Sequence, residues 1–200
     1  MENFHIDSFA ETTFPKIKRV CKALYQKGML AGADGNVSLK LPFEKGVLIT
    51  ASGVHKGFLH LDDLVATDWN GKVIYGKGRP SSELMLHLAI YKKEDTIGAI
   101  IHTHAPWATS LTLSGLPFDT TQLVEAEAIL KEVVVVPYHP PGTQELARET
   151  ASKLGSGPAL ILERHGAITF GRNLEKAFIF MECLEHNAKI LAISHMLASR

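Results

Sequence analysis

The chain has 200 residues, of which 46% are hydrophobic, and its 21 basic and 21 acidic side chains give a formal net charge of zero. This length and composition predict one soluble globular domain over residues 1–200, with a hydrophobic core large enough to fold without disulfides or structural metal ions. The lack of net charge argues against binding to nucleic acid or to an anionic membrane. Cys21 and Cys183 both lie in helical patterns, and the sequence shows neither a membrane span nor a signal segment. We therefore expect a cytoplasmic protein without disulfides.

The first part of the chain predicts a helix followed by two β-hairpins. The helix is expected over about residues 8–28, because apolar side chains recur at helical spacing and a glycine follows. Strands are expected at 37–41 and 46–51, and a second pair at 64–68 and 72–75, joined by a turn at 69–71.

The remaining chain alternates helices and strands. Pro80-Ser81-Ser82-Glu83 is expected to open a helix that ends near Lys93, with either serine as its cap. Further strands are expected at 97–103, 133–137, 159–163 and 167–171, and further helices at 106–113, 122–130, 144–154 and from Asn173 to about residue 197. Hairpins mixed with helices predict an α/β fold, in which helices flank a mixed, largely antiparallel central sheet.

His102 and His104 stand at the end of the apolar run 97–101. Side chains two apart on a strand point to the same face, so both imidazoles can bind one metal ion. The alternative is one core histidine bonded to the backbone and one solvated histidine. His165 lies in the turn between the last two strands, before Gly166, where another segment can approach the backbone closely. Three histidines would form a catalytic zinc site with a position open for substrate.

Glu83 is the candidate acid/base group of this site. A carboxylate at a helix N-terminus often only complements the helix dipole, but beside a divalent cation it can ligate the metal or shuttle protons. Three turns of small residues could cradle an anion such as a phosphate: Gly35-Asn36, Ser52-Gly53 and Ser81-Ser82. Lys40 and Lys56 are interpreted as surface residues in preference to groups that steer a phosphate.

These residues occur in motifs that resemble the class II aldolase/adducin family over nearly the whole chain. The motifs are GNVS (35–38), TASG (50–53), PSSE (80–83), IIHTHAPWAT (100–109), VPYHPPGTQELA (136–147), RHGAITFG (164–171) and NLEKAF (173–178). The resemblance implies the three-layer fold of that family and a homotetramer with active sites between subunits. It also implies that His102, His104 and His165 bind one Zn²⁺ per subunit, although another divalent cation is possible.

The resemblance further assigns roles to the other candidate residues. It implies that Glu83 is a metal ligand in the resting state and becomes the catalytic base. A substrate phosphate would be bound by Gly35, Asn36, Ser52, Gly53, Ser81 and Ser82.

The activity that the resemblance implies is the reversible cleavage of a ketose 1-phosphate, such as fuculose phosphate, to dihydroxyacetone phosphate and an aldehyde. The reaction would pass through a metal-stabilised enediolate. The same scaffold carries methylthioribulose-1-phosphate dehydratases, sugar-phosphate epimerases and decarboxylases, and non-catalytic adducin-like interaction domains. The interaction domains are expected to lack the metal-binding histidines, which this chain retains.

One segment departs from the family pattern. Members that act on fuculose phosphate have a tyrosine after the paired-histidine helix, whereas residues 116–127 contain none. Glu125 is the first candidate to replace it as a second acid/base group, and Glu127 the next. The alternative is that both are solvated carboxylates on a helix. A carboxylate at this position would also suit a dehydratase.

Overall fold

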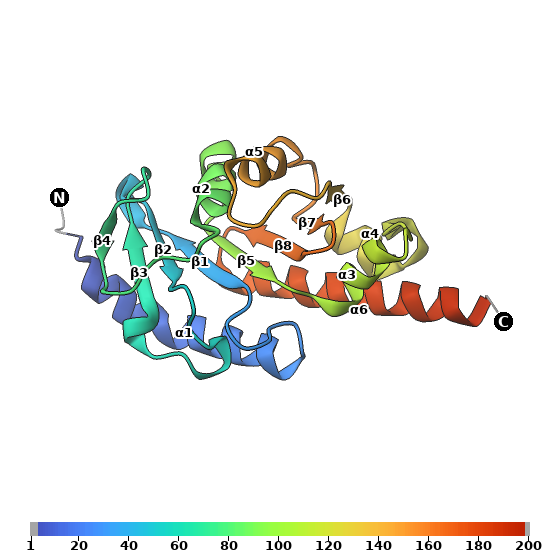
Figure 1. The fold of residues 1–200 in the computed structure, drawn as a ribbon, viewed down its shortest axis with the longest axis horizontal. Coiled ribbons are helices and arrows are strands. Elements are labelled where there is room, and N and C mark those ends of the chain that lie inside the picture. Colours follow the sequence, from blue (N-terminus) through green and yellow to red (C-terminus); the bar gives the residue numbers. More distant parts are fainter. Residues whose placement is uncertain (1–3, 199–200) are drawn as a thin grey trace.

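A computed structural model describes residues 4–198 of the chain. Its centre is one eight-stranded sheet with the strand order β4-β3-β2-β1-β5-β8-β7-β6 (Figure 1). The strands are β1 (Asn36–Lys40), β2 (Val47–Thr50), β3 (Leu64–Thr67), β4 (Val73–Tyr75), β5 (Ala99–Thr103), β6 (Val133–Val136), β7 (Ala159–Leu162) and β8 (Gly166–Gly171). In the described chain β6 and β7 pair in parallel, and the other neighbouring strands pair antiparallel. The predicted mixed, largely antiparallel sheet is confirmed.

Helices cover both faces of this sheet. They are α1 (Ile6–Gln26), α2 (Leu84–Lys93), α3 (Pro106–Leu113), α4 (Val124–Leu130), α5 (Gln144–Ser152) and α6 (Leu174–Ala198). Figure 1 shows α2 and α5 over one face, with α1 and α6 along the other. The α/β fold with flanking helices is therefore confirmed. Within residues 4–198, none of the helices combines the length and apolar character that a membrane crossing requires.

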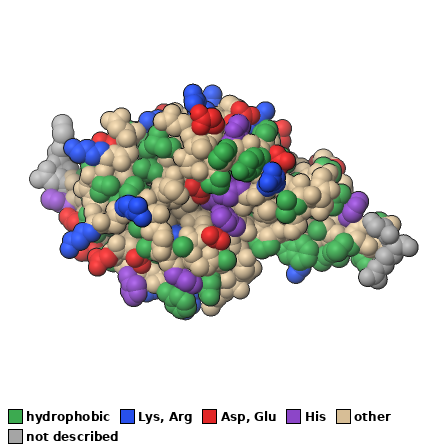
Figure 2. All heavy atoms as spheres, in the orientation of Figure 1, with side chains coloured by type: hydrophobic (Ala, Val, Ile, Leu, Met, Phe, Trp, Pro, Cys, Tyr) green, Lys and Arg blue, Asp and Glu red, His purple; other side chains and the backbone are tan. Residues whose placement is uncertain are grey.

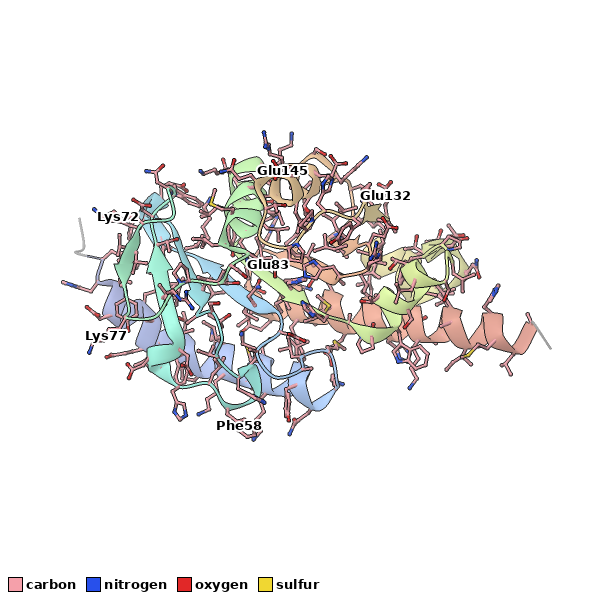
Figure 3. The ribbon with its side chains drawn as sticks, viewed as in Figure 1. Phe58, Lys72, Lys77, Glu83, Glu132 and Glu145 are labelled. Atoms are coloured by element: carbon pink, nitrogen blue, oxygen red, sulfur yellow. The ribbon has the colours of Figure 1, made fainter. Side chains whose placement is uncertain are left out.

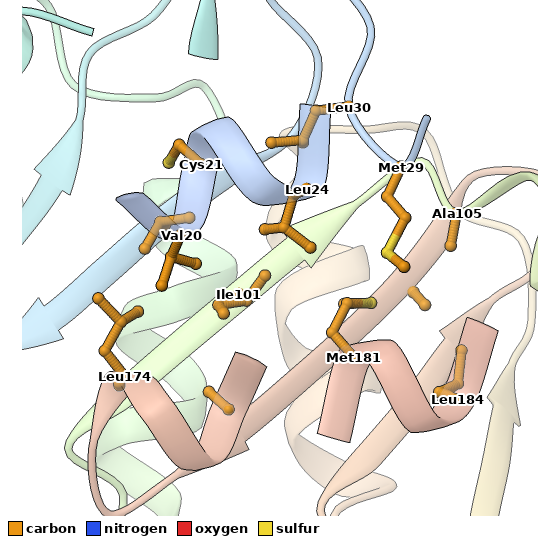
Figure 4. Close-up of a cluster of buried hydrophobic side chains, with 14 of the residues drawn as sticks. Val20, Cys21, Leu24, Met29, Leu30, Ile101, Ala105, Leu174, Met181 and Leu184 are labelled. Atoms are coloured by element: carbon orange, nitrogen blue, oxygen red, sulfur yellow. The ribbon is translucent and has the colours of Figure 1, made fainter. Parts of the chain in front are cut away.

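Strand β5 shows how the sequence pattern builds these two layers. Ile101 belongs to the buried cluster with Leu24 of α1 and Met181 of α6, which Figure 4 shows in close-up. The preceding residue, Ile100, belongs to the cluster on the other face, with Leu88 of α2. Each buried Leu or Ile contributes about 1.5–3 kcal/mol, so both faces of this central strand are held by apolar packing.

The elements match the predicted order, with one local difference at α2. The helix begins at Leu84, and Glu83 occupies the N-cap position without a side-chain cap. The expected serine cap is therefore wrong, because the Ser81 hydroxyl accepts the Glu83 backbone N–H at 3.2 Å, ahead of the helix. At α6 the side chain of Asn173 caps the helix, since Asn173 Oδ1 accepts the Lys176 N–H at 2.9 Å. Both cysteines are free, as expected.

Helix α3 is held at its start by a side chain from α6. Glu185 is 5% exposed, and its carboxylate accepts the N–H groups of Trp107 and Ala108 at 2.9 and 3.0 Å. Hydrogen bonds to a charged group contribute about 1.5–3 kcal/mol each. The cost of burying the Glu185 carboxylate offsets part of this contribution. Glu185→Ala should therefore lower the free energy of unfolding by about 2 kcal/mol, measured by urea denaturation.

The matched control for this prediction is Glu182→Ala on the same helix. Glu182 forms a partly exposed ion pair with Lys27 at 3.0 Å, so its loss should cost at most about 1 kcal/mol. Equal destabilisation by both variants would contradict the capping role of Glu185.

Candidate metal centre

The two predicted ligands on β5 lie on one face of the sheet. Pairing in the sheet places His102 opposite Asn36 of β1 and opposite Ile168 of β8. The intervening Thr103 points the other way, and its hydroxyl contacts the Met181 sulfur of α6 at 3.2 Å. The ring centroids of His102 and His104 are 5.3 Å apart. The predicted common face of the two histidines is thus present.

His165 joins the pair from the turn between β7 and β8. Its ring centroid lies 4.8 Å from that of His102 and 4.9 Å from that of His104. Gly166 permits this approach, because a Cβ at that position would lie 2.2 Å from the Thr103 carbonyl oxygen. The close backbone approach expected at Gly166 is confirmed, and sequence positions 102, 104 and 165 meet at one point.

Glu83 faces the histidines from the start of α2. Its Oε2 lies 3.1 Å from His102 Nε2, and its Oε1 lies 3.4 Å from His165 Nε2. Oε2 also accepts the Asn36 amide Nδ2 at 2.9 Å. Figure 3 labels Glu83 at the end of α2 that borders β1 and β5. Glu83 is 5% exposed, so its carboxylate interacts mainly with these neighbours and little with solvent.

The neighbours determine the ionisation of this cluster. Burial opposes ionisation of Glu83, but His102, His165 and the Asn36 hydrogen bond outweigh it and hold the pKa of the carboxyl well below its usual range. Burial also opposes protonation of His102, and there the Glu83 carboxylate prevails and raises the pKa. Burial, together with His102, lowers the pKa of His104 and lowers that of His165 to about 4. Two of the imidazoles are therefore neutral, the form in which histidine binds a metal.

The polar atoms of this cluster fit a metal ion. Among the buried side-chain atoms of residues 4–198, Glu83 Oε1, His102 Nε2 and His165 Nδ1 have no hydrogen-bond partner. His102 Nδ1 donates to the Ala167 carbonyl oxygen at 2.9 Å, so Nε2 is the ring nitrogen left to face the cluster and to bind a metal. One potential ligand atom from each histidine lies within 4.8 Å of the other two. Three imidazoles and a carboxylate form a donor set suited to a catalytic zinc ion or a similar divalent cation.

The three predicted anion-binding turns line a cavity of about 220 Å³ next to the metal ligands. Its walls include Glu83, His104 and His165 together with Gly35, Asn36, Ser52, Gly53, Ser81 and Ser82. Figure 2 shows histidine and acidic side chains gathered at a hollow near the centre of the molecule. The structure thus brings the predicted phosphate residues together at one place, beside the predicted metal ligands.

The interpretation of Lys56 as a surface residue is wrong. Lys56 is 2% exposed and lines the cavity. Its Nζ donates to the carbonyl oxygens of Ala33 and Val54, both at 2.9 Å. The ammonium therefore ties together the loops that carry the Gly35-Asn36 and Ser52-Gly53 turns. Lys40 lies outside the cavity and forms ion pairs with exposed carboxylates.

Glu125 and Glu127 do not join the cluster within one chain. Both are exposed on α4, and Glu125 lines a different groove with residues of α6 and Trp107. Their assignment as a second acid/base group stays a prediction, and it requires that the group come from a neighbouring subunit.

Two polar groups near the site were not anticipated. Asp34 Oδ2 lies 3.4 Å from His104 Nδ1, where it favours metal binding through the other ring nitrogen. His87 is fully buried and forms a hydrogen bond with Asn36. Its spacing of four residues from Glu83 was a usable signal, because residues four apart share one face of a helix.

Comparison with known proteins places this site in a family. The profile described as the Class II Aldolase and Adducin N-terminal domain matches residues 16–192. L-fuculose phosphate aldolase from Methanococcus vannielii is 38% identical over 172 residues, covering 86% of this chain and 91% of that protein. The 3-oxo-tetronate 4-phosphate decarboxylase from Escherichia coli is 31% identical over 184 residues, covering 89% of this chain and 85% of that one.

A solved structure extends the likeness to three dimensions. The crystal structure of L-fuculose-1-phosphate aldolase from Thermus thermophilus superposes with a TM-score of 0.81 at 28% identity, covering 92% of this chain and 94% of that one. The family match over residues 16–192 contains every strand of the described sheet and all four candidate metal ligands. The chain therefore belongs to the class II aldolase and adducin family.

Proposed function

We propose that the chain is a zinc-dependent sugar-phosphate aldolase that reversibly cleaves a ketose 1-phosphate, of the fuculose phosphate kind, into dihydroxyacetone phosphate and an aldehyde. The observation that carries the proposal is the cavity shared by the three histidines, Glu83 and the three small-residue turns. Turns with free N–H groups suit a phosphate, and a metal ion suits the oxygens at the other end of such a substrate.

Different residues of this chain have different roles in the proposed reaction: the histidines hold the metal, and Glu83 transfers a proton. A zinc ion held by His102, His104 and His165 would supply positive charge to stabilise developing negative charge on substrate oxygens. In condensation, ionised Glu83 takes a proton from the carbon next to the carbonyl of dihydroxyacetone phosphate. In cleavage, the protonated carboxyl returns that proton to the carbon that keeps the electron pair of the broken bond. In the metal-free protein the neighbouring histidines and Asn36 hold the pKa of Glu83 low, so its carboxyl is ionised, which is the protonation state from which a base acts.

The second proton belongs to the hydroxyl that becomes the aldehyde oxygen. We assign its transfer to the partner subunit's Glu125 in a homotetramer, because Glu125 of the same chain lines a separate groove. Sedimentation velocity should then show a particle of four chains. A monomer at assay concentration would contradict this assignment without affecting the metal ligands.

The reaction is tested with the zinc-loaded protein and a panel of 1-phosphates of fuculose, rhamnulose, ribulose and methylthioribulose. A coupled reductase would detect dihydroxyacetone phosphate, which should form from at least one ketose phosphate. No dihydroxyacetone phosphate from any substrate would overturn the aldolase proposal. A dehydrated diketone from methylthioribulose 1-phosphate would instead identify a dehydratase.

The second candidate activity is decarboxylation of a phosphorylated 3-oxo acid. The 31% identity with the Escherichia coli decarboxylase favours it, because the same Lewis acid and base would serve both reactions. Release of carbon dioxide from 3-oxo-tetronate 4-phosphate, without aldolase activity on the panel, would establish this alternative. Sugar-phosphate epimerase activity, a further alternative, would be detected in the same incubations by chromatography of the sugar phosphates.

Lys56 provides a test of the phosphate end of the cavity. Lys56→Met keeps most of the length of the side chain but removes the charge and both hydrogen bonds to the loops. We expect KM for the phosphorylated substrate to rise about 10- to 100-fold, since a lost charge-assisted hydrogen bond costs about 1.5–3 kcal/mol. The inhibition constant of inorganic phosphate should rise by a similar factor.

Lys40→Met is the control for this change, because Lys40 lies outside the cavity and pairs with Glu44 and Asp95. It should leave KM and phosphate inhibition within about threefold of the parent, as expected for surface ion pairs. Phosphate inhibition that is unchanged in Lys56→Met would refute the role of Lys56 in the anion site.

A further inference from the structure

A row of buried polar side chains continues from Glu83 into the core between α2 and β1. Glu83 at the N-cap of α2 is followed at intervals of four residues by His87 and Tyr91 in the helix, a spacing that places the three side chains on one side of it. Asn36 and Ser38 are two apart and share one face of β1. All five residues are at most 5% exposed, and three of them are fully buried. Burying so many polar groups is costly unless each has a hydrogen-bond partner.

The five side chains form a continuous set of hydrogen bonds. Asn36 Nδ2 donates to Glu83 Oε2 at 2.9 Å, and Asn36 Oδ1 is hydrogen-bonded to His87 Nε2. His87 Nδ1 lies 2.7 Å from the Ser38 hydroxyl, which lies 2.9 Å from the Tyr91 hydroxyl. Tyr91 also donates to the Ser38 carbonyl oxygen at 3.1 Å.

The chemistry of the groups sets the direction of every bond in this row. An ionised carboxylate only accepts, so Asn36 must present its NH₂ group to Glu83 and its Oδ1 to His87. Oδ1 only accepts, so His87 must carry its proton on Nε2 and accept at Nδ1. Ser38 must then donate to His87, and the single Tyr91 proton is shared between the Ser38 hydroxyl oxygen and the Ser38 carbonyl oxygen. Each donor in the row therefore points toward Glu83.

Two further observations agree with this direction. The Ser81 hydroxyl oxygen accepts the second Asn36 N–H at 2.9 Å, so both amide hydrogens are used on the side facing the cavity. Burial lowers the pKa of His87 to about 3, which keeps the ring neutral and able to accept at Nδ1. A row of aligned hydrogen bonds in a dry interior strengthens each member, and it fixes the orientation of the last one.

We propose that His87 is a positioning residue for Glu83, acting through Asn36: its Nε2–H holds the Asn36 amide so that the NH₂ group faces the carboxylate and aims it at the metal ligands. Without this donor, Asn36 can rotate its amide and present Oδ1 to Glu83, and two acceptors would then repel each other. The inference rests on the proposed role of Glu83 as the base.

The first test does not depend on catalysis. Long-range ¹H–¹⁵N NMR spectra of the metal-free protein identify which ring nitrogen of His87 carries the proton, with assignment from the spectrum of His87→Gln. A neutral ring protonated at Nε2 is expected. Protonation at Nδ1 would overturn the proposal, whatever the activity of the enzyme.

The second test uses three substitutions at one position, each loaded with metal and assayed on the substrate that the wild type cleaves. The Gln amide nitrogen can reach the position of His Nε2, whereas the shorter Asn amide and the apolar Phe ring cannot donate to Asn36. His87→Asn and His87→Phe should lower kcat about 10- to 100-fold with KM within threefold and one metal ion still bound. His87→Gln should recover kcat to within about threefold of the wild type.

Leu88→Ala controls for general loosening of α2, because Leu88 is fully buried on the same helix and lies outside the row. It should lower the midpoint of thermal unfolding while leaving kcat per folded molecule unchanged. Equal losses of kcat in His87→Gln and His87→Asn, or a loss of the same size in Leu88→Ala, would overturn the proposal. If the wild type cleaves none of the panel, the proposed function fails, and the NMR result still decides the orientation of the row.

Discussion

Replacing His104 or His165 with alanine should abolish stoichiometric metal binding and lower kcat/KM by about 1000-fold or more. The size follows from the several kcal/mol of charge stabilisation that a metal ion supplies, where each 1.36 kcal/mol is a factor of ten in rate. These two histidines are better targets than His102, which is fully buried and bonded to Ala167. Because His104 and His165 border the cavity, their loss should leave the protein folded.

The measurement is the metal content after removal of metal with a chelator and reloading with zinc, together with circular dichroism to confirm folding. His60→Ala is the control, because His60 is an exposed histidine in the 3₁₀ turn before β3. It should retain one metal ion per chain and the activity of the parent. One zinc ion per chain in His104→Ala or His165→Ala would refute the assignment of these ligands.

The metal site could be predicted from the sequence because the position of each ligand depends on local backbone geometry. Alternation along β5 places His102 and His104 together, and the lack of a side chain at Gly166 lets His165 approach. Spacing alone did not connect His165 with the pair, since that contact depends on the pairing of β5 with β8. The resemblance to a family supplied this long-range step.

The misjudged features are those that depend on tertiary surroundings. An isolated lysine in a loop predicts a solvated side chain, yet the loops before β1 and after β2 bury Lys56 and offer it two carbonyl oxygens. In the same way, the serines before α2 follow the usual capping pattern, but the Ser81 oxygen is used by Asn36 and by the Glu83 N–H. Each outcome involves a partner distant in sequence, Ala33 for Lys56 and Asn36 for Ser81.

Glu83→Gln should lower kcat about 100- to 10,000-fold, the usual contribution of a general acid/base group, while most of the metal stays bound. Glutamine keeps the shape of the side chain and can still accept the Asn36 N–H, so the row of buried hydrogen bonds is preserved. It cannot take a proton from carbon, because an amide is not a base at neutral pH. The three histidines remain to hold the ion, so the loss falls on proton transfer and spares metal retention.

The two roles assigned to Glu83 separate in this variant when zinc content and single-turnover rates are measured on the same samples. Glu145→Gln is the matched control, an exposed carboxylate in the first turn of α5, and it should change neither quantity. Near-normal turnover in Glu83→Gln would remove Glu83 as the base and move that role to another group, with the partner subunit's Glu125 the next to test. Loss of the metal with turnover would instead make Glu83 chiefly a ligand, and added zinc at high concentration should then restore the rate.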